Sequence, residues 1–388
     1  MPSQVSTLAG NSLVVEEDSR STNTQMLHQT KLPFAKASRS TTPRHVAVDG
    51  TLVIPQETAE SQPDKRSGSS FRSRPSGGLQ RNRLKDIADS TLSAIKSGHV
   101  SFAGNSLDLD AKVRFSNHNT RYYTPDVSPL SSWASDAPPS KPNKHSVCEI
   151  SVLEASTLAG ARLLHDSIST HSTSYGRVAL LNFASATRPG GGFLTGCQAQ
   201  EESLARSSTL YPSLMTDTAQ QFYELHGKNR QGGFYYHAMI YSPGIVVLKD
   251  DKGDWVSPFE VDILTSAAVN AGDVRAKNAK STKPVDSQRL EGRIETAMRE
   301  RMARILFLFE QQGAKNLVLG SFGTGVFQNN IETVARIWAD LLISSEARYK
   351  HSFQRIVFAV LGHKTFVTFE DTFANRRITR TSSMDAER

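Results

Sequence analysis

Residues 178–210 read VALLNFASATRPGGGFLTGCQAQEESLARSSTL, and this stretch is the most informative part of the sequence. It begins with an apolar run at 178–183, interrupted only by Asn182, which predicts a buried strand. Three glycines follow at 190–192, and after seven more residues the triplet 200–202, Gln-Glu-Glu, begins a segment with helical character. Glycine lets a backbone lie against a ligand without a Cβ clash, and paired carboxylates serve the cleavage of glycosidic bonds. The stretch therefore predicts a strand, a ligand-binding loop and an acid pair in succession.

The overall composition limits the class of protein. The chain has 388 residues, 38% of them hydrophobic, and a net charge of +7, which suits either a polyanionic partner or plain solubility. Its two cysteines are too few for a disulfide framework or a zinc cluster, and this favours a reducing compartment. We recognise neither a signal peptide nor a run of about 20 apolar residues that could span a membrane. We therefore expect a cytoplasmic or nuclear protein, or one found in both places.

The pattern along the chain predicts one α/β core with extensions. We expect a disordered tail over 1–80, a helical and loop extension over 81–145, the core over 146–375 and a flexible tail over 376–388. Alternating apolar segments predict a sheet covered by helices on both faces. Strands are expected at 147–153, 178–183, 239–241, 245–248, 261–267, 316–319 and 355–361. Helices are expected near 84–97, at 201–210, 217–227, 287–312 and 331–342, and in a segment that begins at 157. A loop is expected over 116–143.

A second glycine-rich segment, 320–325, also follows a predicted strand and precedes a predicted helix. Backbone N–H groups at such turns bind phosphate, so two loops of this kind on one sheet could hold a diphosphate from both sides. Taken alone, the segment could equally be a tight turn. Phe322 within this segment and Phe327 just after it could pack on a ribose or a base or could fill the core, and for Phe322 the core is preferred. Asn182 suits either a ligand hydroxyl or the capping of the following turn.

The acid pair has two interpretations. Carboxylates at a helix N-terminus are stabilised electrostatically, so Glu201 and Glu202 could simply cap the helix. In the functional interpretation, one of them acts as general acid and base. Adjacent helical residues point about 100° apart, so the two should have different roles. No histidine is placed to activate Cys197 as a nucleophile, and the histidines lack the spacing of metal ligands, so we predict no metal and no cofactor.

The spacing of three glycines, seven residues and Gln-Glu-Glu resembles the signature of poly(ADP-ribose) glycohydrolases. The surrounding VALLNFASATRPGGGFLTG is similar to the microbial-type branch, whose catalytic unit is a macrodomain, and so is the segment GSFGTGVF at 320–327. The likeness extends over roughly residues 82–375. It implies a three-layer α/β/α fold with a mixed central sheet, and hydrolysis of the ribose–ribose O-glycosidic bonds of poly(ADP-ribose) to release ADP-ribose without a metal.

The resemblance also implies roles for individual residues. Glu202 would protonate the leaving ribose oxygen and then activate water, while Glu201 would hold ribose hydroxyls and Gln200 would support the loop. Asn182 would contact ribose and Phe327 would pack near the distal ribose. The diphosphate would lie between two groups of residues: Gly190, Gly191 and Gly192 on one side, and Ser321, Phe322, Gly323, Thr324, Gly325 and Val326 on the other. Thr324 and Ser321 stand where many relatives have Cys and Ala.

Two other functions stay open at this point. One is a macrodomain reader that binds ADP-ribose without cleaving it, and the other is a hydrolase of mono-ADP-ribose conjugates. The expected partners are poly(ADP-ribose) or ADP-ribosylated proteins, with a role in the reversal of ADP-ribosylation and in the response to DNA damage. We expect a monomer, with no membrane and no sequence-specific nucleic acid among its partners.

Overall fold

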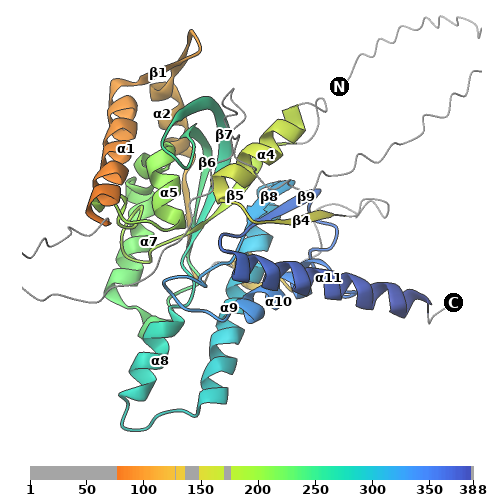
Figure 1. The fold of residues 1–388 in the computed structure, drawn as a ribbon. Helices are drawn as coiled ribbons and strands as arrows, with labels where there is room; N and C mark the ends of the chain where they lie inside the picture. The colour runs from red at the N-terminus through yellow and green to blue at the C-terminus, as the bar shows by residue number, and fades with distance from the viewer. Residues whose placement is uncertain (1–76, 127, 136–147, 170–175, 386–388) are drawn as a thin grey trace, which may run out of the picture. The chain divides into compact units, whose positions relative to one another are not determined.

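The fold is built on a seven-stranded mixed sheet. The computed structural model describes residues 77–126, 128–135, 148–169 and 176–385, with side chains described up to residue 376. The strands follow the order β3-β6-β7-β5-β8-β9-β4, and Figure 1 labels β4 to β9. Strands β7, β5, β8, β9 and β4 are parallel to one another, and β6 pairs antiparallel with both β7 and β3. Their bounds are Arg121–Tyr123 (β3), Glu149–Leu153 (β4), Val178–Phe183 (β5), Met239–Lys249 (β6), Trp255–Ser266 (β7), Asn316–Leu319 (β8) and Arg355–Ala359 (β9).

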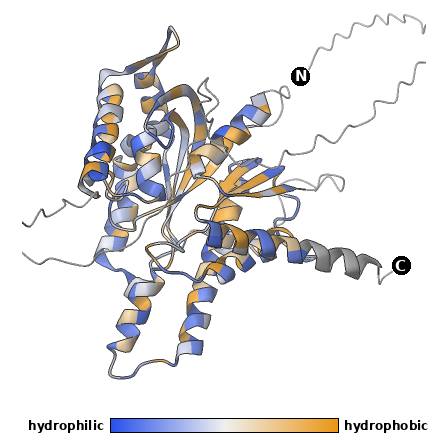
Figure 2. Cartoon of the chain, viewed as in Figure 1, coloured by the Kyte–Doolittle hydropathy of each residue, from blue (hydrophilic) through white to orange (hydrophobic). Residues whose placement is uncertain are grey.

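Helices cover both faces of this sheet. One face carries α9, α10 and α11, with bounds Ser287–Gln311, Ile331–Leu342 and His363–Asp385. The other face carries α4, α5, α6 and α7, with bounds Thr157–Ser169, Gln200–Ser207, Leu210–Leu214 and Asp217–Lys228. Successive side chains of β5 point to opposite faces, so Ala179 and Leu181 pack under the first group and Val178 and Leu180 under the second. The predicted three-layer α/β/α fold is confirmed, and Figure 2 shows the apolar strands enclosed between the helices.

The remaining elements lie around this core. The segment before β3 holds α1 (Gly77–Ser97), the hairpin of β1 (His99–Phe102) and β2 (Asn105–Asp108), and α2 (Leu109–Asn119). The short elements α3 (Ser128–Ser131), η1 (Phe193–Thr195), η2 (Gln231–Gly233) and α8 (Ala271–Ala279) complete the set. Ala88 of α1 packs with Phe193 and Ala205, so α1 supports the first glycine loop and α5 from outside. No helix among the described residues is long and apolar enough to cross a membrane.

Several predicted elements need correction. The segment 116–143 is not a loop throughout, because α2 ends within it and β3 and α3 follow. The two strands expected at 239–241 and 245–248 are one strand, β6, whose register shifts between Ser242 and Ile245. Helix α11 continues to Asp385, into the segment expected as a flexible tail, and no Gly or Pro after Gly362 interrupts it. The expected tail over 1–80 lies outside the described residues except for the first turn of α1.

Candidate active site

A pocket of about 920 Å³ lies at the carboxyl ends of the central parallel strands. Both glycine loops and the acid pair line it, although the loops are more than 120 residues apart in the sequence. The predicted site residues in its lining are Gly191, Gly192, Gln200, Glu201, Glu202, Ser321, Phe322, Gly323, Thr324, Gly325, Val326 and Phe327. Asn182 and Gly190 are not in the lining, and both lie behind Glu201. The topology places these residues together because parallel strands end at the same edge of a sheet.

Gln200 fixes the start of α5 on the sheet. Its Oε1 accepts a hydrogen bond from the Phe183 amide at 2.8 Å, and its Nε2 donates to the Leu181 carbonyl at 2.7 Å. The same Nε2 lies 3.2 Å from the Thr157 hydroxyl of α4. These bonds attach the start of α5 to the end of β5, so Gln200 sets the position from which the two following glutamates project.

Glu201 is the buried member of the acid pair, with 2% of its surface exposed. Its Oε2 accepts the Ser185 amide at 2.6 Å, and its Oε1 lies 3.4 Å from Asn182 Nδ2. Burial raises the pKa of Glu201 to about 8, and the amide hydrogen bonds offset this only in part. The Asn182 side chain also donates to Thr265 at 3.2 Å, so the structure places it as a support of Glu201.

Glu202 faces the first glycine loop. Its Oε1 accepts the Gly192 amide at 2.9 Å, and 9% of its surface is exposed at the pocket wall. Gly191 has φ +61°, a left-handed conformation that L-residues rarely adopt. A Cβ at this position would lie 2.4 Å from Glu202 Oε1. The loop therefore follows the carboxylate so closely that only glycine fits.

The second loop is held by contacts to its own backbone and to the segment after β7. The Asn329 side chain donates to the carbonyls of Gly323 at 2.9 Å and Val269 at 2.7 Å. Phe322 is fully buried against Phe183, with ring centroids 5.6 Å apart, as expected of a core residue. Val326 has 80% of its surface exposed, and the Phe327 ring packs on Tyr235.

Sequence reasoning missed several residues of this site. Ser185 holds Glu201 only through its backbone amide, so its side chain gave no signal. Ser156 caps α4 and also hydrogen-bonds Asp251, and both residues line the pocket although they are distant in the sequence. Arg206 donates to the Cys197 carbonyl at 3.0 Å and so fixes the chain between η1 and α5. The sequence shows Arg206 only as an arginine in the last turn of a short helix, and this does not predict its contact with Cys197.

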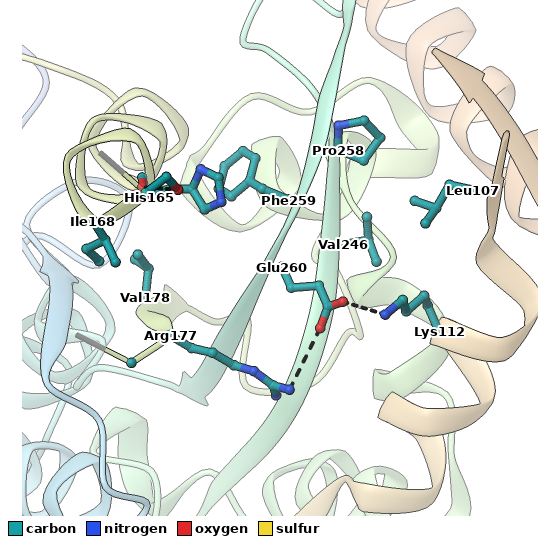
Figure 3. Close-up of a pocket in the computed structure, with 12 residues that line it drawn as sticks. Leu107, Lys112, His165, Ile168, Arg177, Val178, Val246, Pro258, Phe259 and Glu260 are labelled. Atoms are coloured by element: carbon teal, nitrogen blue, oxygen red, sulfur yellow. Dashed lines mark hydrogen bonds and ion pairs between the residues drawn. The ribbon is translucent and has the colours of Figure 1, made fainter. Parts of the chain in front are cut away.

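A second hollow of about 440 Å³ lies at the opposite ends of the same strands (Figure 3). Its charged wall is an ion-pair chain in which Glu260 contacts Lys112 at 2.6 Å and Arg177 at 3.9 Å. Arg177 also contacts Asp262 at 3.5 Å, so these charges are paired with one another. Because β5 also separates the hollow from the acid pair, it is not part of the candidate active site. Among the described residues, no three His, Cys, Asp or Glu side chains converge as metal ligands.

Comparison with known proteins assigns this chain to a family. Residues 88–250 match the family model of the microbial-type PARG catalytic domain. Poly(ADP-ribose) glycohydrolase from Thermomonospora curvata has 34% sequence identity with a TM-score of 0.64, and the likeness covers 76% of this chain and 100% of that one. The chain belongs to the microbial-type poly(ADP-ribose) glycohydrolase family. The glycohydrolase from Deinococcus radiodurans, solved with ADP-ribose, has 31% identity over 71% of this chain and 99% of that chain, with a TM-score of 0.57. The search of curated proteins gave no match.

Family membership confirms three predictions. The resemblance read from the glycine and Gln-Glu-Glu spacing was correct, the fold is that of the solved glycohydrolases, and the protein is a poly(ADP-ribose) glycohydrolase. Because the family is one of glycosidases, the alternative of a macrodomain reader that binds ADP-ribose without cleaving it is set aside.

The raised pKa of Glu201 predicts how the stability of this glycohydrolase changes with pH. The pKa is about 8 in the folded protein and 4.5 in the reference state, so the folded state holds the proton more tightly. The stabilising effect is complete below about pH 4.5 and is lost as pH rises through about 8. Glu201→Gln removes this dependence, so we expect its Tm to exceed that of the wild type by about 5 °C at pH 9 and to match it at pH 5.

Thermal unfolding followed by circular dichroism at both pH values measures this difference. Glu370→Gln, which removes an exposed carboxylate on α11, is the control and should leave Tm unchanged at either pH. A Tm difference of equal size at pH 5 and pH 9 would show that the Glu201 carboxyl does not titrate as its burial predicts.

Proposed function

We propose that this glycohydrolase cleaves poly(ADP-ribose) with Glu202 as general acid and base, while Glu201 and the two glycine loops hold the substrate. The observation that carries the proposal is the convergence of both loops and both carboxyl groups on one pocket. The substrate combines a diphosphate with ribose hydroxyls and a glycosidic oxygen. Backbone amides at strand-to-helix turns suit the diphosphate, and a carboxyl pair suits the ribose.

Glu202 is suited to move the proton. The Gly192 amide holds its Oε1, which leaves Oε2 to reach a glycosidic oxygen in the pocket. As an acid, Glu202 would protonate the leaving ribose oxygen while an oxocarbenium-like state develops. As the resulting carboxylate, it would take a proton from the water that attacks the anomeric carbon. The net reaction adds one water and releases ADP-ribose from the polymer.

Glu201 is suited to hold the ribose. Its carboxyl is neutral at neutral pH, because burial raises its pKa to about 8. A neutral carboxyl can both donate and accept a hydrogen bond, which matches a sugar hydroxyl. Asn182 would stabilise this arrangement from behind, since its Nδ2 lies 3.4 Å from Glu201 Oε1. It would therefore act on the ribose through Glu201.

The opposite division of roles has one observation in its favour. A group that keeps its proton at neutral pH can serve as the acid, and the raised pKa of Glu201 gives it that property. Two features favour Glu202: its greater exposure to the pocket and its contact with the loop that would carry the diphosphate. Glu201, in contrast, is occupied by Ser185 and Asn182.

Gly323→Ala tests whether the second loop binds the diphosphate. Gly323 has φ +74°, and a Cβ there would lie 2.4 Å from Ala268 Cβ and 2.7 Å from Asn329 Nδ2. The loop must then move away from the segment that supports it, at a cost of about 1–3 kcal/mol. We expect the Kd for ADP-ribose, measured by calorimetry, to rise about tenfold or more.

The matched control is Gly292→Ala in α9, where nothing lies within 4 Å of the added Cβ. This variant should bind ADP-ribose as the wild type does. If Gly323→Ala also bound ADP-ribose normally while both proteins were folded, the second loop would not form half of the diphosphate site.

A further inference from the structure

Arg301 of α9 is a fully buried cation. Its Nη1 donates to the Ala267 carbonyl at 2.8 Å, and its Nη2 donates to the carbonyls of Phe234 at 2.9 Å and Tyr235 at 3.2 Å. Within the described part of the chain, it makes no ion pair with a carboxylate, and its Nε has no hydrogen-bond partner. Burying a charge without a counter-ion is costly, so the position calls for an explanation.

The first backbone segment that Arg301 holds contains an unusual residue. Tyr235 has φ +56°, a conformation that is rare for a bulky side chain and that persists only when its surroundings enforce it. The Arg301 guanidinium donates to the Tyr235 carbonyl, and the Tyr235 amide donates to the Arg230 carbonyl at 3.2 Å. The Tyr235 ring then lies against Phe327, with centroids 5.9 Å apart. Phe327 is a lining residue of the active-site pocket.

The second segment that Arg301 holds is residues 267–272, which connect β7 to the start of α8 and support the second glycine loop. Ala268 lies directly under Gly323, and the Val269 carbonyl accepts the Asn329 side chain. The Gly272 amide donates to the Phe327 carbonyl at 3.1 Å. Arg301 therefore joins, at one point, the two segments that determine where the second loop and the Phe327 ring lie.

We propose that Arg301 is a positioning residue for substrate binding, which sets the second glycine loop and Phe327 by clamping the Ala267 and Tyr235 carbonyls. It touches no reacting atom and acts through these backbone segments. The inference rests on the proposed function of the pocket, because it assumes that the loop and Phe327 bind ADP-ribose. Its consequence is a defect in binding and not in the chemical step.

Arg301→Met tests the clamp, since methionine fills much of the space but donates no hydrogen bond. We expect the Kd for ADP-ribose and the KM for poly(ADP-ribose) each to rise about tenfold, while kcat changes less than about threefold. Arg301→Lys keeps the charge and can bind some of the carbonyls, so it should restore part of the affinity. Circular dichroism and Tm establish that each variant is folded.

Tyr235→Gly provides a second route to the same result. Glycine adopts φ +56° without strain but removes the ring behind Phe327, so the Kd should rise as in Arg301→Met. The control is Arg299→Met on the same helix, which loses only its partly exposed ion pair with Asp340 and should bind normally.

Normal ADP-ribose binding by folded Arg301→Met would overturn the inference, as would a fall in kcat at unchanged KM. If Arg301→Met does not fold, Arg301→Lys and Tyr235→Gly decide in its place, and normal binding by both would overturn it. If the wild type itself does not bind ADP-ribose, the proposed binding site falls and this inference falls with it. Normal binding by the wild type and the variants alike overturns the inference alone.

Discussion

Replacing Glu202 with Gln is expected to lower kcat for the release of ADP-ribose from poly(ADP-ribose) by about 10³-fold. The amide cannot give a proton to the leaving ribose oxygen or take one from water. Its oxygen can still accept the Gly192 amide, which binds Glu202 Oε1 at 2.9 Å, so the loop should keep its conformation. The Kd for ADP-ribose should therefore stay within about threefold of the wild-type value.

The measurement is release of labelled ADP-ribose from polymer, with ADP-ribose calorimetry on the same preparation. Glu224→Gln, which removes an exposed carboxylate on α7, is the control and should keep full activity. Glu201→Gln should lose less kcat than Glu202→Gln and should weaken binding. The reverse result, an inactive Glu201→Gln beside an active Glu202→Gln, would assign the proton to Glu201 and reject the proposed division.

The core strands and helices were predictable because their signals are local. The bounds of β5, β8 and α10 match the predicted 178–183, 316–319 and 331–342, since each is a clear apolar run or stripe between turn residues. The elements that were missed depend on partners distant in sequence. The strand β3 is three residues long and exists by pairing with β6. Its own residues, Arg-Tyr-Tyr, carry no alternation that could predict it.

The strand β6 continues through two residues, Pro243 and Gly244, that usually end a strand. The sequence predicts two strands, 239–241 and 245–248, and Pro243 and Gly244 stand between them. In the structure, the Gly244 amide donates to Asp262 of β7 at 2.9 Å, and the pairing resumes after a shift in register. A bulge accommodates the two residues because a neighbouring strand supplies the missing hydrogen bond.

The residues of the candidate site also fall into two groups, those that the sequence predicted and those that it did not. Its glycines and glutamates were found from spacing, because a fixed number of residues separates the loop from the acid pair. The residues that support these glycines and glutamates could not be identified from spacing. Ser185 acts through a backbone amide, and Arg301 lies about 100 residues beyond the acid pair, in a helix that the sequence marked only as apolar. Such supports become visible when the fold brings the segments together.

Replacing Gly191 with Ala is expected to lower kcat/KM for poly(ADP-ribose) by about 10²-fold or more. Two effects combine at this position. The backbone has φ +61°, where a Cβ costs about 1–2 kcal/mol, and the added methyl would lie 2.4 Å from Glu202 Oε1 and 3.1 Å from Glu201 Oε2. Either the loop or the two carboxyl groups must move, so substrate binding and proton transfer should both suffer.

Gly313→Ala separates these two effects. Gly313 has φ +72°, and nothing lies within 4 Å of a Cβ built there, so this variant carries the backbone strain without the contact. Gly313→Ala should lose about 1–2 kcal/mol of stability in urea unfolding, and Gly191→Ala at least as much because it adds the contact, but only Gly191→Ala should lose activity. If Gly313→Ala lost activity to the same extent, backbone strain alone would explain the effect. If Gly191→Ala kept normal kcat/KM, the first loop would not need to follow the acid pair as closely as the structure shows.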